Sequence, residues 1–202
     1  MKKLVILGGA FNPPTMAHFS VAQQIVNEVE EVDKVLFMPV NSNYKKAEMP
    51  TSNEHRFNML QMICKDLDKI EVSRLELDEP RVLTTIETLR ILKEKYPDRE
   101  IVFATGTDNL QELQTWNNYL DILNEFEILV FERGNDDFEE IVEKTDFLQE
   151  NRNSLIKLEN NIKTTLSSTF VRNKIRRGKS IKFLVPEGIE KYIKENNLYV
   201  RR

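Results

Sequence analysis

Residues 4–18, which read LVILGGAFNPPTMAH, decide the fold. Four apolar residues run straight into two glycines, and a helical pattern of apolar residues begins shortly afterwards. Glycines after a strand permit a tight turn and let main-chain N–H groups approach an anion. His18 falls near the start of the following helix, where an imidazole and the positive helix end can face one anion together. The stretch predicts a strand, an anion-binding turn and a helix, although each part alone also fits an ordinary turn and a packed histidine.

Short apolar runs alternate with helical patterns along most of the chain. Several of them lack polar alternation, as strands do when both faces of a parallel sheet are covered. The runs span residues 4–7, 34–38, 70–74, 101–105, 128–132 and, more briefly, 155–158. Repeated strand–helix–strand units imply right-handed crossovers. We therefore predict an α/β fold with a Rossmann-like, doubly wound parallel sheet in residues 1–134.

The remaining residues follow a different pattern. Residues 136–153 are acidic and predict a helix plus a loop, and further helices are predicted over 168–177 and 186–196. Pro186 suits the first turn of the last of these helices. We expect residues 135–202 to form a small, mostly helical part on the edge of the sheet, within one domain spanning 1–202.

Composition excludes several classes of protein. The 202 residues include 33 acidic and 29 basic side chains, which gives a net charge of −4, whereas a general nucleic-acid binder would usually be basic. No apolar run approaches the ~20 residues that span a bilayer. The single cysteine, Cys64, excludes a disulfide framework and a cysteine-built metal site. We expect a cytoplasmic protein with neither nucleic-acid nor membrane partners, and no pattern indicates an oligomeric state.

A second polar segment, LSSTFVR, occupies residues 166–172. Hydroxyl groups ahead of a helix usually cap its free N–H groups, which is the ordinary explanation for the serines. Arg172 would lie about one turn into that helix and could face the same anion as the cap. Hydroxyls, N–H groups and a guanidinium together favour a polyphosphate site.

Together, the two segments resemble the ATP motifs of the HIGH-type nucleotidyltransferase superfamily. The first motif usually reads Gly-Gly-x-Phe-Asp-Pro-x-His-x-Gly-His, and this chain departs from it at Asn12, Thr15 and Ala17. The second segment is similar to Ile-Ser-Ser-Thr-x-Ile-Arg. By this resemblance, the ATP contacts are Gly8, Gly9, Ala10 and Phe11 around the nucleotide, His18 and Thr15 at the α-phosphate, and Ser167, Ser168, Thr169 and Arg172 at the β- and γ-phosphates. The expected catalytic residues are His18, Thr15 and Arg172.

Segments between the motifs resemble one branch, the nicotinate-nucleotide adenylyltransferases. The matching stretches are MPVN at 38–41 with KK at 45–46, TTIETL at 84–89, ATGTD at 104–108 with Trp116, and FERG at 131–134. By this resemblance, Gly106, Asp108 and Arg133 lie against the adenosine. Trp116 would stack on a pyridine ring, and the other substrate contacts would be Thr85, Asn117, Asn41 and Lys46.

The resemblance implies adenylyl transfer from ATP to nicotinate mononucleotide, giving deamido-NAD and pyrophosphate in NAD biosynthesis. The attacking phosphate is already ionised, so positioning and charge stabilisation suffice and no general base is needed. Mg²⁺ is expected to be held mainly by the ATP phosphates, with no protein ligand. Two alternatives stay open, namely another acceptor such as phosphopantetheine or a polyol phosphate, and a catalytically weak nucleotide-binding module. Nicotinate and nicotinamide acceptors are not distinguished.

Overall fold

The structure is a computed structural model that describes residues 1–43 and 49–200. Within these residues, six strands form one sheet in the order β3-β2-β1-β4-β5-β6, and every neighbouring pair is parallel. The strands are β1 (Lys3–Gly9), β2 (Val32–Pro39), β3 (Ile70–Val72), β4 (Glu100–Gly106), β5 (Glu127–Phe131) and β6 (Leu155–Lys157). The predicted doubly wound parallel sheet is therefore confirmed.

Strand order reverses at β1. The chain first builds outward through β2 and β3, and then crosses to the other side of β1 to add β4, β5 and β6. Gly8 pairs with Met38 of β2, while Leu7 pairs with Ala104 of β4. In doubly wound sheets, a crevice opens beyond the carboxyl ends of the strands at such a reversal. The glycine turn after β1 therefore lies where a ligand site is expected.

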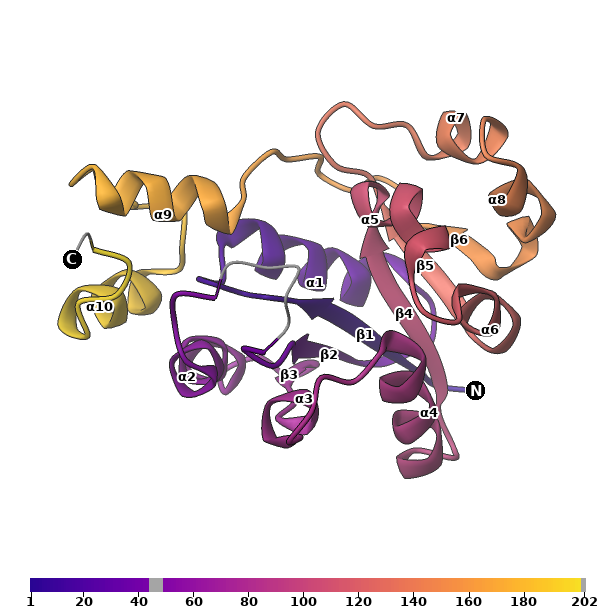
Figure 1. Cartoon of the computed structure of the whole chain (residues 1–202), viewed down its shortest axis with the longest axis horizontal. Coiled ribbons are helices and arrows are strands. Elements are labelled where there is room, and N and C mark those ends of the chain that lie inside the picture. The colour runs from indigo at the N-terminus through magenta and orange to yellow at the C-terminus, as the bar shows by residue number, and fades with distance from the viewer. Residues whose placement is uncertain (44–48, 201–202) are drawn as a thin grey trace.

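Helices cover both faces of the sheet (Figure 1). Val5 and Leu7 of β1 point into one core cluster, and Leu4 and Ile6 point into the other, because successive strand residues face opposite sides. The first cluster includes residues of α1 (Met16–Glu28), α2 (Asn53–Cys64), α9 (Ser168–Arg176) and α10 (Glu187–Glu195). The second includes residues of α4 (Thr85–Lys95), α5 (Thr107–Glu112), α6 (Tyr119–Glu125), α7 (Phe138–Glu143) and α8 (Asp146–Glu150). In the described part of the chain, no helix has the length and apolar character to cross a membrane.

Three local expectations differ from the structure. The third strand ends at Val72 rather than at residue 74, because the chain turns into the short helix α3 (Leu75–Asp78), whose first N–H donates to the Ser73 hydroxyl. Residues 136–153 form two short helices, α7 and α8, and enter a 3-10 turn (Arg152–Ser154).

The third difference concerns the C-terminal helices. They do not extend either edge of the sheet, where β3 and β6 lie, but pack beside α1 and α2 (Figure 1). Ile189 and Ile193 form a buried face of α10 that joins the core cluster of α2, and the Tyr192 hydroxyl lies 2.9 Å from Nδ1 of His55. Packing against α2 removes this apolar face of α10 from water, which accounts for the position of the helix.

Candidate active site

A cleft of about 480 Å³ opens beyond the carboxyl ends of β1, β2 and β4. It is lined by residues from four separate segments. Among them are six residues expected from the sequence to bind substrates: Gly8, Gly9, Ala10, Thr85, Trp116 and Asn117. Parallel strands bring their carboxyl ends to one edge, which is why segments so far apart in sequence meet here.

The first turn (residues 8–18) fixes the state of His18. Nδ1 of His18 accepts a hydrogen bond from the Thr15 main-chain N–H at 2.9 Å, and the Thr15 hydroxyl lies at the same distance. An N–H group can only donate, so Nδ1 carries no proton and the neutral ring keeps its proton on Nε2. Burial, with a smaller contribution from the charge of Arg133, lowers the pKa of His18 to about 4. At neutral pH, His18 is therefore an uncharged donor through Nε2.

Direct hydrogen bonds join the two polar motifs. Arg172 is buried, and its Nη1 donates to the Asn12 carbonyl at 2.9 Å. The Ser168 hydroxyl donates to the Pro13 carbonyl at 2.7 Å. Ser167 caps α9 by accepting from the Phe170 N–H at 3.2 Å, as the sequence predicts. The start of α9 thus lies against the first turn, while the contacts of these residues with phosphate stay predictions.

The C-terminal segment also contacts the first turn. The Tyr199 hydroxyl donates to Oδ1 of Asn12 at 2.6 Å, and both side chains are buried. Phe11 adopts a positive φ of 47° and is buried, with its ring in edge contact with those of His18 and Phe37. Residues 11 and 12 of the motif therefore hold the turn in place from inside the core.

A buried arginine that sequence reasoning missed holds the same turn. Arg56 of α2 is fully buried and donates to the Ala10 carbonyl at 2.9 Å, the Val40 carbonyl at 2.6 Å and Oδ1 of Asn53 at 2.7 Å. Burial lowers the pKa of Arg56 to about 10, so the side chain is still charged at neutral pH. Ala10 and Val40 both line the cleft, and Arg56 ties them together from below. No local sequence signal distinguishes this arginine from a surface residue of an amphipathic helix.

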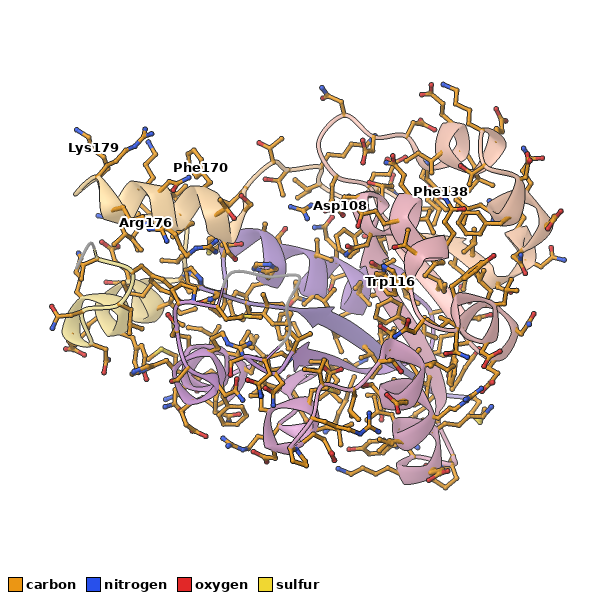
Figure 2. All side chains as sticks on the ribbon, viewed as in Figure 1. Asp108, Trp116, Phe138, Phe170, Arg176 and Lys179 are labelled. Atoms are coloured by element: carbon orange, nitrogen blue, oxygen red, sulfur yellow. The ribbon has the colours of Figure 1, made fainter. Side chains whose placement is uncertain are left out.

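Gly106 lies beneath an exposed ion pair. Nη1 of Arg133 donates to Asp108 at 2.7 Å. A Cβ at position 106 would lie 2.5 Å from Oδ1 of Asp108 and 2.7 Å from Cδ of Arg133, so only glycine fits without a shift of both side chains. Figure 2 shows Asp108 and Trp116 on the same side of the molecule, near β4 and α5. The predicted adenosine contacts are therefore adjacent, and they bond to each other in this structure.

Two predicted acceptor contacts are not part of the cleft lining that the structure describes. The buried Asn41 side chain donates to the carbonyls of Glu76 at 3.3 Å and Glu79 at 3.0 Å, so its amide holds α3 in place. Lys46 lies outside the described residues. The assignment of these residues to substrate binding stays a prediction.

The other wall of the cleft combines an indole, a helix start and an acid. Trp116 is half-buried, with its ring 5.9 Å from that of Phe103. Thr84 is the residue before α4, and its main-chain N–H donates to the Glu87 carboxylate at 2.8 Å. Glu76, which sequence reasoning also missed, is buried and accepts from the Thr88 hydroxyl at 2.7 Å. Burial raises the pKa of Glu76 to about 7.

The fold and the cleft define a nucleotide-binding α/β protein, and comparison with known proteins identifies its family. Residues 6–174 match the family model described as cytidylyltransferase-like, and the chain belongs to this nucleotidyltransferase family, within its nicotinate-nucleotide adenylyltransferase branch. A probable nicotinate-nucleotide adenylyltransferase of Clostridium botulinum is 31% identical over 98% of both chains. The Clostridium perfringens (strain 13) protein of the same description is 30% identical over 100% of both chains.

Solved structures agree on the fold. The nicotinic acid mononucleotide adenylyltransferase of Plasmodium falciparum complexed with NaAD is 23% identical, with a TM-score of 0.79 and 98% of both chains covered. A putative nicotinate-nucleotide adenylyltransferase of Vibrio parahaemolyticus is 21% identical, with a TM-score of 0.67, covering 98% of this chain and 96% of the other. The resemblance drawn from the two ATP motifs and the segments between them is confirmed.

Proposed function

We propose that this chain transfers the adenylyl group of ATP to nicotinate mononucleotide, releasing deamido-NAD and pyrophosphate in NAD biosynthesis. The observation that carries the proposal is the cleft, where the turn of the first ATP motif meets Thr85 and Trp116. The names of the relatives support the same acceptor. They do not favour phosphopantetheine or polyol phosphate as acceptors, nor an inactive binding module.

The phosphate side of the site acts by positioning and charge stabilisation. The acceptor phosphate attacks the α-phosphorus of ATP, and the bond to the β-phosphate oxygen breaks as pyrophosphate leaves. Nε2–H of His18 donates to the α-phosphate, where negative charge must be stabilised in the transition state. The free N–H groups at the start of α9, with Ser167 and Thr169, hold the leaving phosphates.

Mg²⁺ would be held here mainly by the phosphates of ATP rather than by protein side chains. The described residues contain no group of three or more histidine, cysteine or acidic side chains that could hold a metal. Such a site fits a cation coordinated by the triphosphate and water, which neutralises charge on the leaving group.

The acceptor side recognises a flat, cationic ring. A pyridinium stacked on Trp116 gains both apolar burial and cation–π attraction. The positive end of α4, at Thr85, favours a carboxylate or the oxygen of an amide at the edge of the ring.

The test measures pyrophosphate release with ATP and Mg²⁺ for three acceptors: nicotinate mononucleotide, nicotinamide mononucleotide and phosphopantetheine. We expect turnover with nicotinate mononucleotide, loss of turnover in excess EDTA, and a fall of ~10²- to 10³-fold in kcat for His18→Ala. His55→Ala is the matched control, because the second histidine contacts Tyr192 on α10 and does not line the cleft. Absence of turnover with both pyridine acceptors, or preference for phosphopantetheine, would refute the proposal.

A further inference from the structure

Glu76 is a buried acid that adenylyl transfer does not require. It belongs to α3, it is one of the residues that line the cleft, and it is 8% exposed. Among the cleft-lining residues that the structure describes, it is the only one with an ionisable side chain. A carboxyl group in such a place is costly when charged, so its presence calls for a function.

The position of Glu76 relates it to the acceptor ring. Its Oε1 accepts from Thr88, three residues along α4 from Thr85. A helix rises about 1.5 Å per residue, so the carboxyl group lies roughly one turn from the helix end that would hold the ring substituent. Trp116 borders the same cleft. When the acceptor is nicotinate mononucleotide, two carboxyl groups therefore share one partly desolvated space.

The arginines of the segments that hold Glu76 and Thr88 are paired with other acids. Arg74 is the residue before α3, and it forms ion pairs with Glu54 and Asp78. Ahead of α4, Arg81 pairs with Glu87. Farther along α4, Arg90 bonds two acids of α6, Asp121 and Glu125.

The two described side chains that hydrogen-bond to Glu76 are polar but neutral. From the end of β2, Asn41 donates to the main-chain carbonyl of Glu76 and not to its carboxylate. The Thr88 hydroxyl donates to the carboxyl group, but burial outweighs this hydrogen bond and raises the pKa of Glu76 to about 7. Close to neutral pH, the group can therefore respond to the charge of a ligand.

We propose that Glu76 takes up a proton from solvent when nicotinate mononucleotide enters the cleft, and thereby makes the preference between anionic and neutral acceptors depend on pH. Two carboxylates in a desolvated cleft repel each other, and protonation of one removes the repulsion. The protonated acid keeps an oxygen to accept from Thr88 and gains an O–H to donate. Nicotinamide mononucleotide has no second carboxylate and imposes no such requirement. This inference rests on the proposed function.

The direction of the pH dependence follows. At high pH, binding of the carboxylate ring must first protonate Glu76, so kcat/KM for nicotinate mononucleotide falls by up to ~10-fold per pH unit once Glu76 is ionised. The nicotinamide analogue carries the same ribose phosphate, so other titrating groups cancel in the ratio of the two kcat/KM values. The ratio is therefore the quantity to measure.

The experiment compares wild type with Glu76→Gln from pH 6 to pH 9. We expect the nicotinate-to-nicotinamide ratio to fall by up to ~100-fold in wild type, mostly above pH 7, and to stay flat in Glu76→Gln. Glu79→Gln is the matched control, since Glu79 follows α3 and its side chain does not line the cleft. Calorimetry in buffers of different ionisation enthalpy gives a second readout, in which nicotinate mononucleotide takes up more protons than its amide in wild type but not in Glu76→Gln.

Thr88→Val provides an independent variant should Glu76→Gln not fold. Loss of the hydroxyl removes the hydrogen bond that favours the ionised carboxylate, so the fall in the ratio should move to higher pH. The inference would be overturned if the ratio of the two kcat/KM values fell with pH in Glu76→Gln as it does in wild type, or if the midpoint of that fall stayed in place in Thr88→Val. Either result would leave the proposed function intact. If wild type turns over neither pyridine acceptor, the proposed function fails and the inference fails with it.

Discussion

The first turn and the acid-bearing wall of the cleft are built in opposite ways. At the first turn, polar side chains from distant helices bond to main-chain carbonyls, as Arg56 does to Ala10 and Arg172 does to Asn12. At the wall, Glu76, Thr85 and Trp116 themselves line the cleft. The turn therefore presents a backbone held from behind, whereas the wall presents residues of the cleft lining. In the proposed function, the turn suits the triphosphate and the wall distinguishes acceptors by shape and charge.

Burial also shifts pKa values in opposite directions in the two regions. It lowers the pKa of His18 to about 4 and raises that of Glu76 to about 7. In both cases the uncharged form is favoured, because a desolvated charge is costly. Since both substrates are anions, a site with few charges of its own lets ligand charge determine the protonation of its groups.

The largest expected effect tests the rigidity of the turn. Arg56→Met removes three hydrogen bonds and leaves the Ala10 and Val40 carbonyls without that donor, so we expect a loss of about 3–5 kcal/mol in the free energy of unfolding by urea denaturation. Arg74→Met is the control, since its ion pairs are solvent-exposed and contribute little. Equal losses in the two variants would contradict the role assigned to Arg56.

The opposite pKa shifts predict opposite dependences of stability on pH. Between pH 6.5 and 4, the unfolded chain protonates His18 while the native chain resists, so His18 reduces the free energy of unfolding as pH falls, by about 2–3 kcal/mol. His18→Gln should remove this loss. Glu76 binds its proton more tightly in the native state than in the unfolded state. Its contribution to the free energy of unfolding therefore increases as pH falls from 7 towards 4.5, and Glu76→Gln should remove that gain. Urea melts across this range check both signs, and parallel curves for all three proteins would refute the contrast.

A smaller effect separates acceptor binding from ATP binding. Trp116→Leu removes the aromatic face, so we expect KM for nicotinate mononucleotide to rise about tenfold, with kcat and the KM for ATP nearly unchanged. Trp116→Phe retains a ring and should lose less. An equal rise in the KM for ATP would show that the two regions are not independent.

The smallest effect concerns the N-terminal cap of α9, the helix whose start lies against the first turn. Ser167→Ala removes the acceptor for the Phe170 N–H, at a cost of about 1 kcal/mol in stability, or roughly 2–4 °C in Tm. Ser167→Thr keeps a hydroxyl group and should retain most of the stability that Ser167→Ala loses. A Tm for Ser167→Ala that equals wild type would exclude a capping role.

The sequence predicts the regular part of this structure because parallel strands and glycine turns leave local signals. Strands such as Ile101–Thr105 appear as uninterrupted apolar runs, and the motif at residues 8–18 places the turn correctly. Arg56 and Glu76 escape notice because their burial depends on segments that are distant in sequence, and in isolation each resembles a surface residue of a helix. The position of α10 escapes for the same reason, since its apolar face does not specify which surface it covers.

The hydrogen bond between Tyr199 and Asn12 joins positions 187 residues apart. During synthesis, Asn12 leaves the ribosome long before Tyr199, so this hydrogen bond forms only after the residues between them have followed. A nascent or prematurely terminated chain carries both ATP motifs without this contact to Asn12. The first turn thus gains this contact only after both ATP motifs have been synthesised.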